Sequence, residues 1–164
     1  MKLSEILTLE RIETHLDAAD KSDVLRALSR LIAQQAPRGS EPSSEAIAPP
    51  APLADIERVL GDRERLASTG IGDGVAIPHG RVAGLDHFVA ALAIRPGGVP
   101  FDAIDGRPAS IFFAVVGPEK AAGEHLKCLA RIGRVLRDDA VRVRLLAAKD
   151  SADALAIVTS ADGA

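Results

Sequence analysis

The chain has 164 residues, of which 47% are hydrophobic and only 2% aromatic, and its net charge is -3. This length fits one domain, whose core must be built mainly from aliphatic side chains. Few aromatic rings and scattered basic residues argue against a nucleic-acid partner. The single cysteine, Cys128, excludes an internal disulfide. Acidic residues interrupt the apolar N-terminal pattern, unlike a signal peptide, and no apolar run is long enough for membrane insertion, so we expect a soluble cytoplasmic protein.

The first third of the chain predicts two short elements, one helix and one insertion. Residues 3–7 (LSEIL) are typical of a helical turn, and residues 10–16 (ERIETHL) alternate as a strand does. Residues 20–35 predict a helix that Asp20 or Ser22 can cap. Its apolar side chains recur at helical spacing; they are Val24, Leu25, Leu28, Leu31 and Ile32. Residues 36–52 are rich in Pro, Ser and Ala and predict an extended, flexible insertion.

The middle of the chain predicts a helix followed by two buried strands. Residues 53–66 return to helical spacing. After a glycine-rich stretch, the apolar runs 87–95 and 110–117 predict strands, with a turn at Asp105 and Gly106 between them.

The last third predicts three helices. Residues 123–139 form one, with a core-facing stripe of Leu126, Leu129, Gly133 and Leu136. Residues 138–150 and 151–161 form two more, with Asp138 or Asp139 and Ser151 as caps. Strands that alternate with helices in this way indicate an α/β domain with a mostly buried sheet.

The stretch from Ser68 to Arg81 (STGIGDGVAIPHGR) contains four glycines and places His79 between Pro78 and Gly80. Proline fixes the backbone before the histidine, and glycine lets a ligand approach closely after it. Successive free N–H groups in a glycine-rich turn can bind an anion. Since neutral imidazole is a nucleophile near pH 7, this loop predicts that His79 accepts and donates a phosphoryl group.

The transferred group is negatively charged, so nearby cations and hydroxyl donors would lower the barrier. The candidates close in sequence are Arg63, Arg65, Arg81, Ser68 and Thr69. His125 is a second candidate, because it stands near a helix start, where the helix dipole favours an anion. The helical wheel places it at the border of the core face, outside the stripe, where it could hold His79 or its phosphate by a hydrogen bond.

Structural roles stay open for all four histidines at this point. From pattern alone, His79 can equally be a turn residue, and for His125 a structural role is favoured. His15 and His87 have no supporting context, and we interpret both as structural.

Other chemistries have weaker support. Ser68, Asp73 and His79 could form a hydrolase triad, but the G-x-S-x-G turn is missing. His125 and Cys128 could share a metal, but two ligands do not make a zinc site, and Cys128 is better interpreted as a small buried hydrophobe. The glycines of GIGDG are neither a dinucleotide fingerprint nor a Walker motif.

Three segments together resemble a known family. They are residues 62–81 (DRERLASTGIGDGVAIPHGR), 101–118 (FDAIDGRPASIFFAVVGP) and 123–138 (GEHLKCLARIGRVLRD). They are similar to the IIA proteins of the phosphoenolpyruvate-dependent phosphotransferase system (PTS), in the fructose/mannitol superfamily and most closely in its nitrogen-regulatory branch. The resemblance implies a single α/β domain over residues 1–158, with a mixed sheet flanked by helices, a tail at 159–164, and no metal or organic cofactor.

The resemblance also implies roles for individual residues. His79 matches the phosphorylated histidine, which would accept its phosphoryl group from the carrier protein HPr or its nitrogen-branch counterpart. Arg63 matches the arginine that faces the phosphohistidine, and His125 matches the second histidine of the site. We expect Ser68, Thr69 and Gly80 to contact the phosphate, and we expect Val75 and Ile77 to seat a partner protein.

Several functions remain open for such a protein. The first is a regulatory phosphocarrier that controls a transporter, a kinase or a metabolic enzyme. The second is a sugar-uptake IIA component that passes phosphate to a separate IIB protein. The third is a binding module that no longer transfers phosphate, and a metal-dependent hydrolase is a distant fourth.

Overall fold

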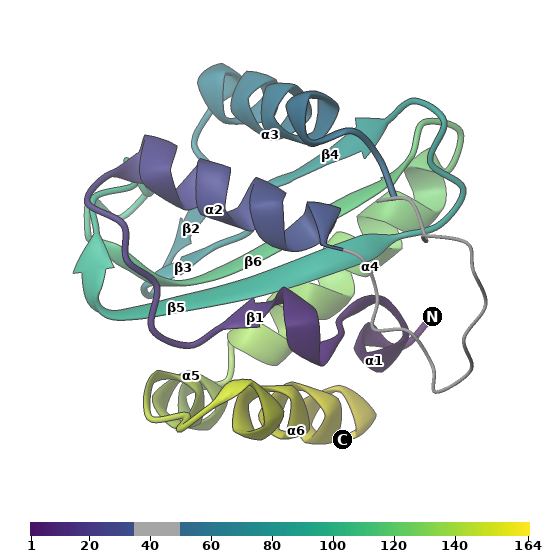
Figure 1. The fold of residues 1–164 in the computed structure, drawn as a ribbon. Helices are drawn as coiled ribbons and strands as arrows, with labels where there is room; N and C mark the ends of the chain where they lie inside the picture. The colour runs from purple at the N-terminus through teal and green to yellow at the C-terminus, as the bar shows by residue number, and fades with distance from the viewer. Residues whose placement is uncertain (35–49) are drawn as a thin grey trace.

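The computed structural model describes residues 1–34 and 50–164, and most of the insertion predicted at 36–52 lies outside this part. In chain order the elements are α1 (Leu3–Ile6), a 3-10 helix (Leu9–Arg11), β1 (Ile12–Glu13), α2 (Lys21–Ala33), α3 (Leu53–Leu66), β2 (Gly70–Gly72), β3 (Val75–Ala76), β4 (His79–Val82), β5 (Val89–Val99), β6 (Ala109–Pro118), α4 (Ala122–Leu136), α5 (Asp139–Leu146) and α6 (Ser151–Gly163). Figure 1 shows one sheet between two layers of helices. The expected α/β domain with a mixed sheet and flanking helices is confirmed.

The strand order is β1-β5-β6-β3-β2, and β4 pairs with β6 next to β3. β5 and β6 are antiparallel, whereas β1, β3 and β4 each pair in parallel with a long central strand. β3 pairs with β6 at Ile111 and Phe112, and β4 continues along the same strand from Val115. Only Ile77 and Pro78 interrupt the chain between β3 and β4.

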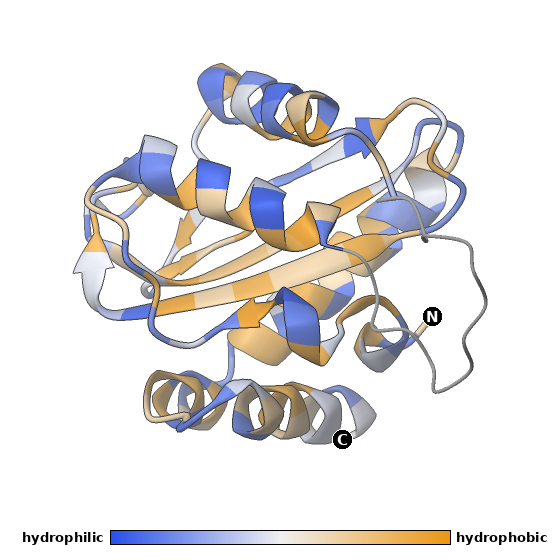
Figure 2. Cartoon of the chain, in the orientation of Figure 1, coloured by the Kyte–Doolittle hydropathy of each residue, from blue (hydrophilic) through white to orange (hydrophobic). Residues whose placement is uncertain are grey.

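Each face of the sheet has its own apolar core. Side chains alternate along a strand, so Phe113 of β6 lies in the core with α4, α5 and α6, whereas Phe112 lies in the core with α2 and α3. The buried parts of both central strands, residues 89–94 and 111–117, are therefore continuous apolar runs, as predicted, whereas β5 continues past them through the less buried residues 95–98. In Figure 2 these strands are mostly orange, and the outer sides of α2 and α3 above them are largely blue.

Carboxylates begin three of the helices. Asp20 caps α2 and Asp138 caps α5, each accepting a hydrogen bond of 2.9 Å from a backbone N–H, so both predictions are confirmed. The predicted cap of α6 is wrong, because Asp150 accepts that bond, at 2.8 Å. The hydroxyl of Ser151 instead donates to the carbonyl of Ile12 at 2.9 Å and ties α6 to β1.

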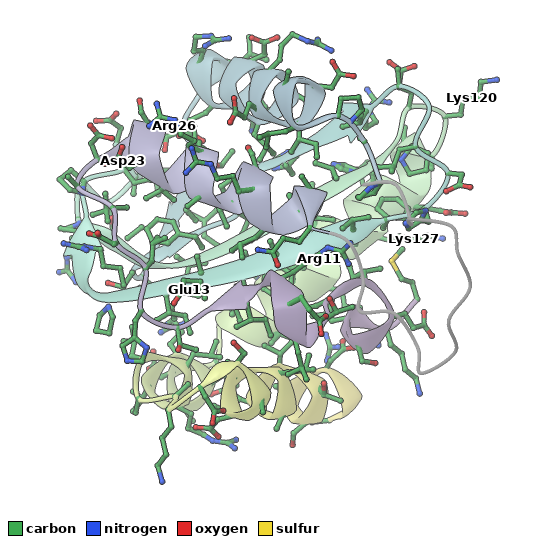
Figure 3. All side chains as sticks on the ribbon, in the orientation of Figure 1. Arg11, Glu13, Asp23, Arg26, Lys120 and Lys127 are labelled. Atoms are coloured by element: carbon green, nitrogen blue, oxygen red, sulfur yellow. The ribbon has the colours of Figure 1, made fainter. Side chains whose placement is uncertain are left out.

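The strand predicted over residues 10–16 is wrong except at β1. Arg11 ends a 3-10 turn, and its buried guanidinium donates to the carbonyls of Ile32, at 3.3 Å, and Gln34, at 2.9 Å. These carbonyls lie at the C-terminal end of α2, where a helix lacks internal partners. Figure 3 labels Arg11 beside this end of α2. The alternation of apolar and polar residues at 10–16 cannot reveal these contacts, because their partners lie more than twenty residues away in the chain.

Helix α4 forms as predicted, but its predicted stripe is only partly right. Leu136 is buried and Leu129 packs against the core, whereas Leu126 is 69% exposed. The buried residues are His125, Cys128, Ile132, Val135 and Leu136. The apolar positions of this helix spread over two adjacent faces, and the packing against the sheet selects one of them.

Helix α6 continues to Gly163, so most of the tail expected at 159–164 is helical. The buried carboxylate of Asp162 accepts a hydrogen bond of 2.8 Å from the N–H of Leu3 and pairs with Arg131. These contacts join the last turn of α6 to α1 and α4. Within the two described stretches, no helix has the length and apolar character that a membrane crossing requires.

Candidate functional site

His79 is the first residue of β4, directly after the Ile77–Pro78 interruption. Its Nδ1 lies 2.8 Å from the carbonyl oxygen of Ile77. Because a carbonyl only accepts, Nδ1 donates this bond and carries the proton of the neutral ring. The lone pair is then on Nε2. One local hydrogen bond thus fixes both the tautomer and the direction of the ring.

Gly80 allows α3 to lie close to β4. A Cβ at this position would lie 2.1 Å from Cγ1 of Val59 on α3, so a larger residue would push the helix away. Since successive residues of a strand face opposite sides, Gly80 faces α3, and His79 and Arg81 face the other way. The close approach brings the last turn of α3, with Arg63, beside the histidine.

His79 lies in a cleft of about 860 Å³ between α3, β4 and the N-terminal half of α4. Four predicted site residues line it, namely Arg63 from α3, His79 and Gly80 from β4, and His125 from α4. The candidate Arg81 also lines the cleft, and the remaining lining residues are Val59, Asp62, Leu66, Glu119, Ala122, Leu126 and Leu129.

His125 is 6% exposed and belongs to the buried face of α4, so its expected position at the border of that face is wrong. Its ring centroid lies 5.6 Å from that of His79, and the ring stacks on Phe88 at 5.9 Å. Burial, together with His79 and Arg81, lowers the pKa of His125 to about 4. The ring is therefore neutral at pH 7, and its Nδ1 has no hydrogen-bond partner among the residues that the structure describes.

His79 is also neutral at pH 7. Burial lowers its pKa and the charge of Arg63 adds to the lowering, whereas the hydrogen bond with Ile77 and the charge of Glu64 oppose it. The neutral form is the one with a free lone pair on nitrogen. Arg63 itself donates from Nη1 to the carbonyl of Ala67 at 2.8 Å, at the C-terminal end of α3.

The structure brings two of the three candidate arginines to the cleft. Arg81 lines the cleft with Arg63, and its Nη1 donates to the carbonyl of Glu119 at 3.2 Å. Arg65 instead pairs with Asp62, has an exposed side chain and does not line the cleft.

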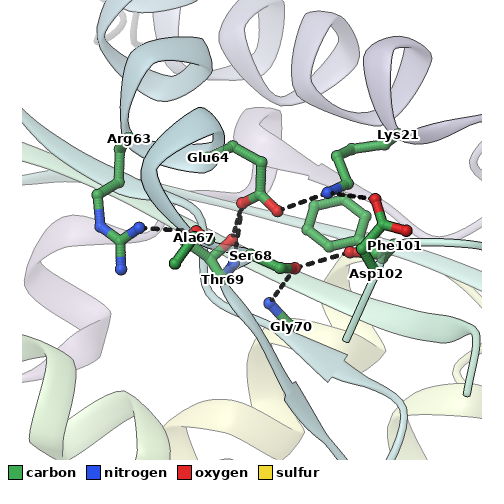
Figure 4. Close-up of polar contacts among 9 residues, drawn as sticks. All are labelled: Lys21, Arg63, Glu64, Ala67, Ser68, Thr69, Gly70, Phe101 and Asp102. Carbon is green, nitrogen blue, oxygen red and sulfur yellow. Dashed lines mark hydrogen bonds and ion pairs between the residues drawn. The ribbon is translucent and has the colours of Figure 1, made fainter. Parts of the chain in front are cut away.

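Ser68 and Thr69, expected to contact the phosphate, form hydrogen bonds inside the protein instead. The hydroxyl of Ser68 donates to the carbonyl of Phe101 at 2.7 Å and accepts from the N–H of Gly70 at 3.1 Å. Thr69 is buried and donates from both its N–H and its hydroxyl to Glu64. Figure 4 shows both side chains in this network, and neither lines the cleft.

The glycines before His79 build a hairpin in place of the expected anion-binding turn. Gly72 and Gly74 have φ angles of 93° and 77°, which glycine adopts without strain, and they form the tight connection between β2 and β3. Asp73 lies at the tip of this hairpin, where its N–H donates to Asp105, so the structure does not bring Ser68, Asp73 and His79 together as a triad.

The prediction that Val75 and Ile77 contact a partner protein is wrong. Val75 and Ile77 are buried in the core with α4. Leu66 and Leu126 line the cleft instead and are 83% and 69% exposed. Neither was predicted to contact a partner protein. Their signal is weak, because each also fits the apolar spacing of its helix. Cys128 is buried, as expected, and burial raises the pKa of its thiol to about 11.

The fold and the cleft define a class of protein, an α/β domain that orients one neutral histidine in an open cleft beside a second histidine and two arginines. Residues 5–161 match the model of the family described as "Phosphoenolpyruvate-dependent sugar phosphotransferase system, EIIA 2". The chain belongs to this family, as the resemblance predicted.

Its relatives include nitrogen regulatory proteins. One from Pseudomonas aeruginosa is 35% identical over 148 residues, which cover 90% of this chain and 88% of the relative. One from Bradyrhizobium diazoefficiens is 40% identical over 96 residues, 58% of this chain and 63% of that protein. The crystal structure of nitrogen regulatory protein IIA-Ntr from Neisseria meningitidis has a TM-score of 0.81 and 33% identity, over 96% of this chain and 99% of that one. These similarities confirm the predicted likeness to the nitrogen-regulatory branch.

Proposed function

We propose that this protein is a phosphocarrier, that Nε2 of His79 is its acceptor, and that HPr or its nitrogen-branch counterpart is its donor. The hydrogen bond from Nδ1 of His79 to Ile77 carries this proposal, because it leaves the unprotonated nitrogen available in an open cleft. Membership of the EIIA 2 family supports phosphoryl transfer as the reaction class.

In the proposed step, the lone pair of Nε2 forms a bond to phosphorus. The bond between phosphorus and the donor's histidine nitrogen breaks, and its electron pair stays on the donor. The proton stays on Nδ1 of His79 throughout, hydrogen-bonded to the carbonyl oxygen of Ile77. The ring therefore needs no separate base to become a nucleophile, since it is already neutral.

The cleft supplies charges and contacts for the transferred group. Arg63 and Arg81 are the cations that would offset the charge on the phosphoryl oxygens, and a planar guanidinium can hold two oxygens at once. His125 packs beside His79 as a neutral ring and would restrict its motion or donate a hydrogen bond to the phosphoryl group. Gly80 contributes indirectly, because it lets α3, which carries Arg63, pack closely on β4 beside His79.

We propose a regulatory output, in which the phosphorylation state of His79 controls the binding of a transporter, a kinase or an enzyme. The nitrogen regulatory proteins among the relatives support this choice. A phosphoryl group adds about 1.5 to 2 negative charges at pH 7, enough to change the affinity of a docking surface. The alternative output is transfer to a separate IIB protein in sugar uptake.

Phosphotransfer with purified components tests the proposal. The protein is mixed with phosphoenolpyruvate, the first enzyme of the system, and HPr or its nitrogen-branch counterpart. We expect an acid-labile adduct of one phosphoryl group by intact mass in the wild type and in His87→Ala, an exposed-histidine control, but not in His79→Ala. An adduct on His79→Ala, or none with any competent donor, would refute it. Onward transfer to a IIB protein would favour the sugar-uptake role.

A further inference from the structure

Glu64 is a buried carboxylate, adjacent to Arg63 in the chain, with no part in the transfer described above. Its side chain is 4% exposed. Oε2 accepts hydrogen bonds from the N–H of Thr69, at 2.9 Å, and from the hydroxyl of the same residue. Oε1 lies 3.0 Å from Nζ of Lys21 on α2. A carboxylate at this depth requires such partners, because burial of an unpaired charge is costly.

Lys21 connects Glu64 to the segment between β5 and β6. Its Nζ lies 3.0 Å from the carboxylate of Asp102 and 5.1 Å from the ring centroid of Phe101. Burial would lower the pKa of Lys21, but Glu64 and Asp102 outweigh this effect and raise it. The ammonium therefore stays charged and balances Glu64. Figure 4 shows this chain of contacts from α2 to the end of α3.

The contacts of Glu64 and Lys21 hold the short turn at residues 67–69, whose first carbonyl accepts the hydrogen bond from the guanidinium of Arg63. Glu64 fixes Thr69, and Ala67, two residues earlier, accepts the 2.8 Å hydrogen bond from Nη1 of Arg63. Between them, Ser68 is bound to the carbonyl of Phe101 at 2.7 Å. The turn is thus held by α3 on one side and by the β5–β6 connection on the other.

We propose that Glu64 is a positioning residue of the phosphoryl site. Through Thr69 and the carbonyl of Ala67, it holds Arg63 where the guanidinium faces the phosphoryl group on His79, and Lys21 neutralises it. This inference rests on the proposed function, in which Arg63 contacts that group. It also assigns the buried hydroxyl of Thr69 a role in supporting Arg63.

Two isosteric amide variants test the proposal. Glu64→Gln keeps the size of the side chain but leaves one acceptor oxygen, so its –NH2 must face either the ammonium of Lys21 or the donors of Thr69, and the contacts of Glu64 cannot all form. Asp162→Asn is the matched control, because Asp162 is also 4% exposed, accepts a backbone N–H and pairs with an arginine, but lies on α6 at the opposite face of the sheet. We expect both variants to unfold at a lower temperature, whereas only Glu64→Gln slows phosphoryl transfer to His79, by about 10-fold. Equal slowing by Asp162→Asn, or no slowing by Glu64→Gln, would overturn the proposal.

A double-mutant cycle separates positioning from general stability. In an Arg63→Lys background, Glu64→Gln should have little further effect on the transfer rate, because the guanidinium that Glu64 positions is gone. An undiminished 10-fold effect in that background would overturn the proposal.

A measurement that needs no phosphoryl donor distinguishes failure of the positioning role of Glu64 from failure of the proposed phosphocarrier function. Nitrogen-15 relaxation at Nε of Arg63 should show a more mobile guanidinium in Glu64→Gln but not in Asp162→Asn. Unchanged order of Arg63 in Glu64→Gln would overturn the positioning role. A wild-type protein that accepts no phosphoryl group would instead refute the proposed function.

Discussion

His125 should make the fold sensitive to acid, because its ring is buried in the neutral form. Its pKa is about 4 in the folded protein, against 6.5 for a free histidine. Above pH 6.5 the ring is neutral in both states, and its full contribution to stability is present. Below pH 6.5 the unfolded chain binds a proton that the folded chain does not, so stability falls until the pH reaches about 4. At about 1.4 kcal/mol per pH unit, this interval corresponds to about 3 kcal/mol.

The assay is urea unfolding between pH 4 and pH 7 for the wild type and His125→Gln, which has a similar size and no titrating ring. Carboxylates and His79 titrate in both proteins, so the difference between the two curves isolates His125. We expect the wild type to lose about 3 kcal/mol more than the variant as the pH falls over this range. Parallel curves, or an imidazole of His125 that titrates near pH 6.5 by NMR, would refute the reasoning.

Three further predictions concern the packing of α3 on β4, the charge of the cleft and the burial of Cys128. Gly80→Ala should destabilise the fold by about 1–3 kcal/mol, because its Cβ would lie 2.1 Å from Val59. Adding Val59→Ala should recover much of that loss in chemical denaturation, and a single variant of normal stability would contradict the close approach. Arg81→Gln should slow transfer to His79 roughly 10-fold, whereas Arg65→Gln should leave it unchanged; equal rates in both would exclude Arg81 from the site. Cys128 should resist a thiol reagent at pH 8 until urea unfolds the protein, since burial raises its pKa to about 11, and rapid native labelling would contradict this burial.

The sequence predicts the parts of the site whose constraints are local. Pro78, His79 and Gly80 are consecutive, so the sequence alone shows that a glycine follows the histidine. It does not show why, because the close contact with Val59 of α3 appears only in the structure. The central strands are also predictable, since two buried faces require continuous apolar runs.

Predictions from the local pattern are wrong for residues whose environment depends on distant parts of the chain. The hydroxyl of Ser68 is bound to Phe101, 33 residues away, and a pattern of small polar residues beside a histidine cannot distinguish this from a phosphate contact. Arg11 breaks an alternating pattern because it binds the end of α2. Leu126 fits the apolar stripe of α4, but the packed helix leaves it exposed. For Ser68 and Arg11 a long-range contact overrides the local pattern, and for Leu126 the orientation of α4 on the sheet does so.

If His79 carries a phosphoryl group as proposed, the apolar and charged groups around it would let one cleft both pass the group on and signal its presence. Leu66 and Leu126 are exposed on the cleft, and large exposed apolar side chains beside a site are typical of a surface that a partner covers. Such a partner must also accommodate the charged side chains that line the same cleft. With His79 unphosphorylated, Arg63 and Arg81 favour a partner that brings carboxylates. A phosphoryl group offsets these cations, and the same partner then faces repulsion, so we infer that one reaction on one nitrogen exchanges the set of partners without any change of fold.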